Sequence, residues 1–262
     1  MARNDIKIDA SLMGFIKRKV LSLGFSFYKK YYDFLNGGGL FFRAEIETTS
    51  FCNRRCNYCP NSIYDRGTKK DLMSVELWTK IMKELKEMNW HGIIQPVGYG
   101  EPLSDIRLPE LLAITKKYLP KCKVVIYTNG DYLTEEYYSK LKPYVSGYKV
   151  ANHGKLNPNM PKKRDIVIEN IKLFSNRASI MPIKNDVRLD KCDLPTQLLQ
   201  VDWEGNVKLC CNDYLGKVRF GNLNKESVID VWNKPQFKKI RNDIANGKPV
   251  IDLCKKCFLQ AE

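Results

Sequence analysis

A short segment rich in cysteine carries the clearest chemistry in this sequence. Cys52, Cys56 and Cys59 follow the spacing C-x3-C-x2-C. Three thiolates in one loop can each bind a different iron of a four-iron, four-sulfur cube, which leaves the fourth iron without a protein ligand. Structural zinc sites take four ligands from paired knuckles, and buried structural cysteines do not gather in a polar loop. We therefore expect an iron–sulfur cluster whose open iron can bind a small molecule.

A second group of cysteines lies near the end of the chain. Cys254 and Cys257 are separated by two residues, a spacing that lets both thiols reach one ion or one cluster. Cys192, Cys210 and Cys211 precede this knuckle. Zinc and iron–sulfur ligation both remain open on spacing alone, and the choice matters because zinc is redox-silent.

Three further segments carry polar residues where predicted strands end. Residues 98–102 read G-x-G-E-P, and glycines there allow close approach of a ligand to backbone carbonyls that can accept bonds from an ammonium group. Thr128 and Asn129 follow the next predicted strand, and Asn152 and His153 follow the one after. In an ordinary protein each of these segments would be a simple turn.

The surrounding pattern alternates strands with helices of about a dozen residues. Expected strands cover 40–48, 93–97, 123–127 and 144–151, and expected helices follow Ser74, span 108–118 and follow Thr134. This alternation predicts an α/β fold of parallel βα units, with its chemistry at the carboxyl ends of the strands.

The chain divides into three predicted parts. Residues 1–39 form a basic amphipathic helical extension, residues 40–185 the βα units, and residues 186–262 a small unit with a hairpin at 198–211 and helices at 227–232 and 235–245. The extension either packs on the catalytic domain, which we favour, or lies on a membrane surface.

Composition bears on the redox state of the cysteines and on the kind of partner that the protein binds. The chain has 262 residues, nine cysteines and a formal net charge of +15. No secretory signal precedes the cysteines, so reduced, metal-bound thiols in the cytoplasm fit better than disulfides. The positive charge favours an anionic partner, such as an acidic electron donor, a phosphorylated substrate or a membrane surface. No aromatic–basic recognition motif points to nucleic acid.

The first cysteine motif resembles the cluster loop of the radical S-adenosylmethionine superfamily, with Tyr58 in its aromatic position. That resemblance implies a trimmed partial (βα) barrel of the radical SAM type and S-adenosylmethionine chelated by the open iron. It also implies that a cluster electron cleaves the cofactor to a 5′-deoxyadenosyl radical. The expected cofactor-binding residues are Tyr58, Gly98, Tyr99, Gly100, Glu101, Pro102, Thr128, Asn129 and Asn152. Asn152 and His153 depart from the Ser or Thr that the family often presents to the ribose.

The C-terminal cysteines resemble the SPASM auxiliary-cluster domain in its shortened form, the Twitch domain. Cys192, about a dozen residues and then G-x4-C at Cys210 match its beginning. The resemblance implies one auxiliary [4Fe-4S] cluster on Cys192, Cys210, Cys254 and Cys257, and so two [4Fe-4S] clusters in all. A zinc ribbon on the same thiols is the alternative.

Size, trimmed barrel and short tail together resemble the radical dehydrogenases of aminoglycoside biosynthesis, which oxidise an alcohol of an aminocyclitol. We therefore expect oxidation of a hydroxylated sugar or aminocyclitol, with electrons from a flavodoxin or ferredoxin. A radical epimerase with Cys211 or Cys122 as hydrogen donor is the alternative, and a non-enzymatic zinc-binding interaction module is the alternative of another class. Candidate substrate contacts are Lys149, His153 and Arg188.

Removal of residues 1–39 distinguishes the two roles of the extension. If it packs on the catalytic domain, its loss exposes apolar surface, and we expect the truncated protein to aggregate in light scattering. A truncated protein that stays monodisperse but no longer sediments with anionic liposomes would contradict this expectation and favour a membrane-surface role.

Overall fold

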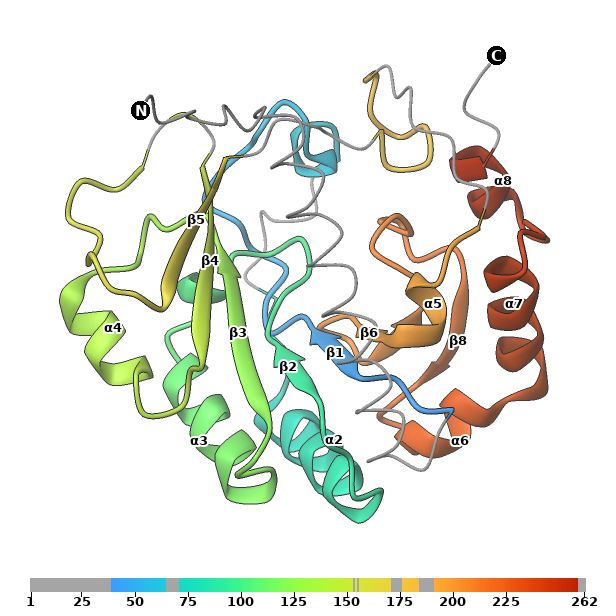
Figure 1. Cartoon of the computed structure of the whole chain (residues 1–262), viewed down its shortest axis with the longest axis horizontal. Coiled ribbons are helices and arrows are strands. Elements are labelled where there is room, and N and C mark those ends of the chain that lie inside the picture. The colour runs from blue at the N-terminus through green and yellow to red at the C-terminus, as the bar shows by residue number, and fades with distance from the viewer. Residues whose placement is uncertain are drawn as a thin grey trace, which may run out of the picture.

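The structure is a computed structural model that describes residues 39–64, 71–152, 154, 156–170, 176–183 and 191–258. The predicted extension up to residue 38, His153 and Arg188 lie outside the described residues. Within these ranges, no helix combines the length and apolar character needed to cross a membrane. Figure 1 shows a curved central sheet with helices along one side and a helical C-terminal part at one end.

The sheet has the strand order β5-β4-β3-β2-β1-β6-β7-β8. Strands β1 to β6 run parallel to one another, and β7 pairs antiparallel with both β6 and β8. Because β5 and β8 stand at opposite ends of this order, the described sheet is open, and the expected α/β fold with a trimmed barrel is confirmed. The strands are β1 (Arg43–Ile46), β2 (Ile93–Gln95), β3 (Lys123–Thr128), β4 (Gly147–Asn152), β5 (Ile166–Asn170), β6 (Leu198–Val201), β7 (Asn206–Lys208) and β8 (Arg219–Asn222).

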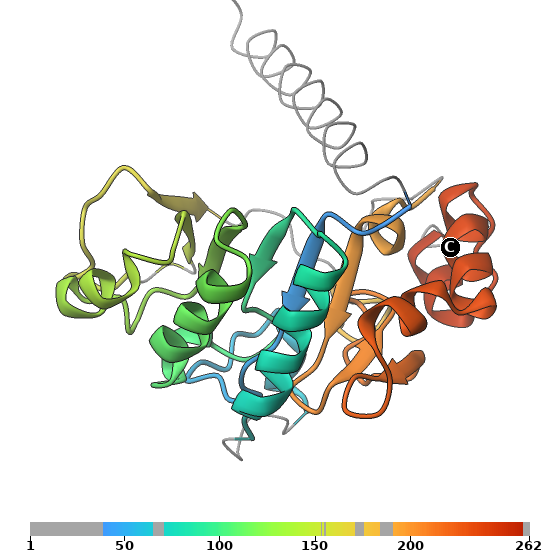
Figure 2. The same ribbon diagram turned by 90° about the horizontal axis from the view of Figure 1, so that it is seen from below.

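Three helices cover one face of the parallel strands, side by side in Figure 2. They are α2 (Val75–Glu87), α3 (Leu108–Tyr118) and α4 (Glu135–Leu141). Both predicted caps are present, since Ser74 accepts a hydrogen bond from the Leu77 amide and Thr134 accepts one from the Tyr137 amide. The remaining helices are η1 (Pro60–Ser62), η2 (Pro102–Ser104), α5 (Leu194–Gln197), α6 (Val228–Asn233), α7 (Pro235–Ala245) and α8 (Asp252–Phe258).

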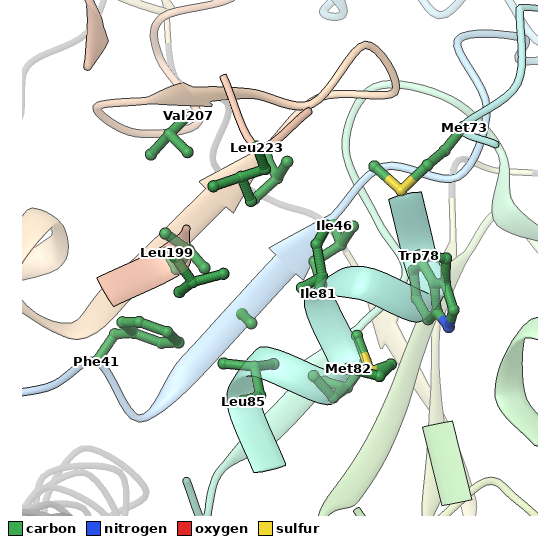
Figure 3. Packing of buried hydrophobic residues seen from close by; sticks show 14 of the residues in the cluster. Phe41, Ile46, Met73, Trp78, Ile81, Met82, Leu85, Leu199, Val207 and Leu223 are labelled. Carbon is green, nitrogen blue, oxygen red and sulfur yellow. The ribbon is translucent and has the colours of Figure 1, made fainter. Parts of the chain in front are cut away.

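One hydrophobic core lies between this helical layer and the sheet. Ala44 and Ile46 alternate along β1 with more polar residues, and both are fully buried under α2. Figure 3 shows the core continuing from Trp78 and Ile81 of α2 to Leu199 of β6 and Leu223 beyond β8. The core therefore runs without a break beneath both halves of the chain.

The C-terminal segment joins the sheet in a way that sequence patterns did not indicate. The hairpin of β6 and β7 forms as expected, but β6 also pairs in parallel with β1, from Arg43 opposite Leu198 to Ile46 opposite Val201. Strands β5 and β8 were not predicted. The division at residues 185 and 186 stays a prediction, and the unit expected to be separate shares its sheet and core with the βα units.

This topology brings the predicted functional loops to one edge. The carboxyl ends of the parallel strands meet there, as they do in complete βα barrels. The other face of β1 carries Arg43 and Glu45, and Glu47 follows directly after the strand. The open side of the sheet is thus lined by polar side chains, while the helix side is apolar.

Candidate functional site

The first cysteine loop follows β1 and ends at η1. Cys52, Cys56 and Cys59 are all half-buried, and the Cys59 amide donates to the Cys56 carbonyl at 2.9 Å, which turns the loop back on itself. Burial raises the pKa of Cys52 to about 11 and also raises the pKa of Cys59. Burial and a hydrogen bond to Cys56 raise the pKa of Tyr58. Buried thiols of this kind become thiolates when a metal replaces their protons.

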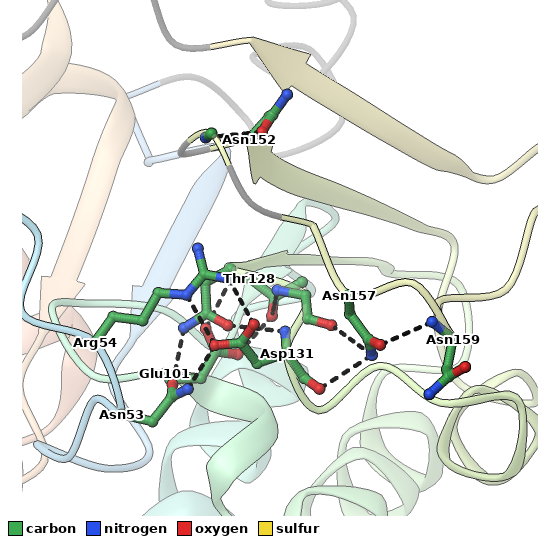
Figure 4. Close-up of polar contacts among 11 residues, drawn as sticks. Asn53, Arg54, Glu101, Thr128, Asp131, Asn152, Asn157 and Asn159 are labelled. Carbon is green, nitrogen blue, oxygen red and sulfur yellow. Dashed lines mark hydrogen bonds and ion pairs between the residues drawn. The ribbon is translucent and has the colours of Figure 1, made fainter.

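Asp131, directly after the β3 turn, clamps this loop. Its carboxylate accepts from Arg54 Nε at 2.8 Å and Nη2 at 2.5 Å, and from Asn53 Nδ2 at 2.7 Å. Figure 4 shows these three side chains converging between the loop and the turn. A two-pronged guanidinium–carboxylate pair fixes orientation as well as distance. The cysteine loop is thus held to the end of β3 by Asn53, Arg54 and Asp131, none of which is a predicted cluster ligand.

Glu101 links the G-x-G-E-P loop to the same turn. Its carboxylate accepts from Thr128 Oγ1 at 2.6 Å and from the Asn129 amide at 2.8 Å. Asn129 Nδ2 in turn donates to Asn53 Oδ1 at 2.9 Å. Burial raises the pKa of Glu101 to about 7, although these hydrogen bonds act in the opposite direction by stabilising the carboxylate. The Glu101 side chain is therefore turned inward as a brace for the loop.

Glu47 holds the glycine turn itself. Its Oε1 accepts from the Tyr99 amide at 2.6 Å and from the Gly100 amide at 2.9 Å. A Cβ at Gly100 would stand 1.9 Å from the Thr49 carbonyl oxygen, and one at Gly98 would meet the Glu47 carboxyl. Both glycines are needed because the end of β1 passes directly against the turn.

The other predicted residues lie apart from this network. Asn152 donates to Asn170 of β5 at 2.7 Å, away from the Asp131 clamp in Figure 4. Lys149 pairs with Glu169 at 2.9 Å, which leaves it engaged with the neighbouring strand. Cys122 is buried in the hydrophobic core before β3, at the opposite end of that strand from Thr128.

The four predicted auxiliary cysteines come together from three places. Cys192 precedes α5, Cys210 follows β7, and Cys254 and Cys257 lie one turn apart on α8. Cys192, Cys210 and Cys254 each interact electrostatically with Cys257, and burial raises the pKa of all four thiols, that of Cys254 to about 12. Asn212 Nδ2 donates to Cys257 Sγ at 3.3 Å.

The donor sets fit iron–sulfur clusters. Both consist of thiols alone, the usual ligands of such clusters. Among the described residues, no three His, Cys, Asp or Glu side chains are grouped to hold a single metal ion. A zinc ion binds each thiolate at about 2.3 Å, so all its sulfur ligands gather around one point. In a cubane each thiolate binds its own iron, so the four sulfurs stand farther apart.

Tyr99, Arg177 and Cys211 lie between the two cysteine sets. The Tyr99 hydroxyl donates a short hydrogen bond to the Cys211 carbonyl, and Arg177 Nη1 lies 3.8 Å from Cys211 Sγ. The Arg177 guanidinium stands 5.6 Å from the centre of the Tyr99 ring. Sequence reasoning missed Arg177, because its segment has no periodic pattern. Its φ of 53° is in the left-handed region that non-glycine residues rarely adopt.

Comparison with known proteins agrees with this geometry. The family model described as the radical SAM superfamily matches residues 46–155, and the one described as the SPASM iron–sulfur cluster-binding domain matches residues 192–258. The chain is 30% identical over 234 residues to the S-adenosyl-L-methionine-dependent 2-deoxy-scyllo-inosamine dehydrogenase of Niallia circulans. The match covers 83% of this chain and 93% of that protein.

Two solved structures are similar over an equal share of the chain. The crystal structure of BtrN in complex with AdoMet and 2-DOIA has a TM-score of 0.77 at 30% identity, covering 83% of this chain and 93% of that one. BtrN in an open conformation has a TM-score of 0.70, covering 83% and 92%. These similarities favour neither the radical epimerase nor the zinc-binding module.

Substitution of Asp131 tests the clamp on the cysteine loop. Asp131→Asn weakens a half-buried charge-assisted pair worth about 1 kcal/mol, so we expect a chelator to remove iron from the first cluster about fivefold faster. Glu136→Gln, which removes an exposed pair with Lys140, is the matched control and should lose iron at the wild-type rate. Equal rates for wild type and Asp131→Asn would show that the clamp is dispensable.

Proposed function

Because the chain belongs to the radical S-adenosylmethionine superfamily, we propose that it oxidises a secondary alcohol of an aminocyclitol to a ketone. The similarity to a 2-deoxy-scyllo-inosamine dehydrogenase covers nearly all of that relative, and the two family models include both cysteine regions. The observation that supports this proposal most directly is the Tyr99–Cys211 hydrogen bond. It joins the loop predicted to hold the cofactor to the residue next to Cys210, a predicted ligand of the auxiliary cluster.

In this proposal Cys52, Cys56 and Cys59 hold a [4Fe-4S] cluster with one open iron. The Gly98–Pro102 loop presents its carbonyls to the amino group of S-adenosylmethionine, and Glu47 keeps that loop in its turn. When bound, the cofactors supply a carbon radical that removes a hydrogen atom from the substrate and an acceptor for the electron that remains. The protein's part is to decide which hydrogen is removed.

A second [4Fe-4S] cluster would be held by Cys192, Cys210, Cys254 and Cys257. The side-chain amide of Asn212 donates a hydrogen bond to Cys257 Sγ. Hydrogen bonds of this kind stabilise a thiolate that binds a cluster. Loss of a proton and one electron turns a carbon radical beside a hydroxyl into a ketone. A nearby redox-active centre therefore supports oxidation, which a zinc ion could not.

We place the substrate against Tyr99, Arg177 and Cys211. Arg177 carries planar donors suited to hydroxyl oxygens, and the three residues lie between the two cysteine sets. Lys149 is a weaker candidate because Glu169 already engages it, and His153 and Arg188 stay predictions. Asn152, bonded to β5, stays a prediction as a ribose contact.

The reducing electron requires a partner. The formal charge of +15 supports an acidic carrier such as a flavodoxin or ferredoxin, which would approach by electrostatic steering. We propose a cytoplasmic protein, with peripheral membrane contact through residues 1–39 as the alternative use of that charge.

Iron content tests the two centres. We expect about eight irons per chain after anaerobic reconstitution, four for each cluster. Replacing Cys52, Cys56 and Cys59 with Ala should remove about four and abolish the formation of 5′-deoxyadenosine. Cys211→Ala should keep all eight, whereas Cys210→Ala should lose the auxiliary cluster. About four irons with one zinc per chain would contradict the auxiliary cluster.

The reaction itself is tested with 2-deoxy-scyllo-inosamine in deuterated water. We expect a ketone two mass units lighter than the substrate, together with one 5′-deoxyadenosine per turnover. A product of unchanged constitution that carries one deuterium at an inverted carbon would make the enzyme an epimerase. Cleavage of S-adenosylmethionine without any change in this compound would contradict the proposed substrate.

A further inference from the structure

A cavity outside the proposed catalytic centre is walled by the auxiliary region. It has a volume of about 340 Å³, within the range of small-molecule sites. The hairpin of β6 and β7 contributes Lys208, the loop before β8 contributes Tyr214, and β8 contributes its first residue, Arg219. Tyr64, which follows η1, closes it from the N-terminal half of the chain. None of the cysteines or the residues of the G-x-G-E-P loop lines it.

Lys208 is the unusual residue of this cavity. Its side chain lines the cavity, yet the residue is only 2% exposed. Its ammonium forms no hydrogen bond or ion pair in the part of the chain that the structure describes. The carboxylates of Glu45 and Asp213 attract this ammonium electrostatically, yet neither of these two described residues forms an ion pair with it. Burial without direct hydrogen bonds is costly for a charge, because the lost hydration is not replaced. Such a group calls for an anion at the same place.

The acidic residues at the cavity are already engaged. Asp202 accepts from the amides of Glu204 at 3.1 Å and Asn206 at 2.8 Å, and from the Asn206 side chain. Glu204 also accepts from Asn206 Nδ2 at 3.1 Å. Asp213, whose charge Lys208 also feels, accepts from two amides of its own loop. These carboxylates are satisfied by neutral donors and do not pair with the ammonium.

The remaining walls suit an organic ligand. Tyr64 and Tyr214 have ring centres 5.8 Å apart, and Trp203 also faces the cavity. Aromatic faces pack well against rings and sugars. Arg219 binds the Gly216 carbonyl through Nε at 2.9 Å, and this residue lies exposed at the cavity. Lys208 at the base and Arg219 at the edge thus offer two cations beside an aromatic wall.

We propose that this cavity binds the phosphate or carboxylate group of a small molecule, with Lys208 as its central ligand and Arg219 as its second cation. Free phosphate and a phosphate ester on a ring compound share this chemistry. The aromatic wall favours the ester, since free phosphate makes no use of Tyr64 and Tyr214.

The cavity also touches the proposed catalytic centre through one residue. The Tyr214 hydroxyl donates to Asn61 Oδ1 at 2.9 Å, and Asn61 Nδ2 donates to the Tyr99 carbonyl at 2.9 Å. The Tyr99 and Tyr214 rings meet edge to face at 4.6 Å. A ligand stacked on Tyr214 would therefore be linked to the G-x-G-E-P loop through Tyr99 and Asn61, without contacting that loop itself.

Thermal unfolding of the cluster-loaded protein tests the site, with no turnover required. Phosphate at ten times its dissociation constant should raise the Tm of wild type by about 3 °C over chloride at equal ionic strength. Lys208→Met should begin at an equal or higher Tm, because it removes a buried charge that makes no direct ion pair, and should not respond to phosphate. Lys225→Met, an exposed lysine of the same region, is the matched control and should respond as wild type does.

Each other outcome overturns a part of the proposal. A lower Tm for Lys208→Met and no response of wild type would make Lys208 structural only. Equal responses of wild type and Lys208→Met would place the anion elsewhere. Glucose 6-phosphate should bind at least tenfold tighter than inorganic phosphate, with glucose alone inactive, and equal affinities would rule out the ester. All these readouts are independent of whether the protein oxidises an aminocyclitol.

Discussion

The arrangement of the site depends on one buried carboxylate, that of Glu101. It receives hydrogen bonds from Thr128 and Asn129 across 27 and 28 residues of sequence, and so ties the ends of β2 and β3 together. Asn129 and Asp131 then carry this constraint to the cysteine loop, which has no regular secondary structure before η1. A loop of that kind cannot hold its own geometry, because unordered backbone has too many accessible conformations. Its order is supplied by the neighbouring strand end.

The auxiliary region is fixed to the same frame through β1. That strand lies between β2 and β6, so the loops after β1 and β2 and the hairpin that leads to Cys210 descend from adjacent strands. Two further links join the C-terminal segment to this frame, since Trp232 donates to the Gly39 carbonyl before β1 and Lys80 of α2 donates to the Leu223 and Glu226 carbonyls. The relative position of the two cysteine sets is therefore set by a single sheet.

Sequence patterns were sufficient for local features and for the motif, and insufficient for long-range pairing. The spacing of Cys52, Cys56 and Cys59 and the caps at Ser74 and Thr134 are local, and each indicated its structure or chemistry. The parallel pairing of β6 with β1 joins residues 155 apart, and nothing in Leu198–Val201 distinguishes it from a hairpin strand alone. Asp131 was missed for the same reason, since its partners Asn53 and Arg54 lie 78 and 77 residues away. Asp131 directly after the Thr128–Gly130 turn was the available signal.

The place of β6 beside β1 also sets the order in which the chain can mature on the ribosome. The first strand of the sheet is made about 150 residues before the strand that covers its second edge. Until then β1 keeps an unpaired edge next to Phe41 and Phe42, both of which are buried in the structure. Pairings of such long range are slow to form and leave a nascent chain open to association. The C-terminal segment therefore completes the sheet as well as carrying the second group of cysteines, and a chain interrupted before residue 198 leaves the second edge of β1 unpaired.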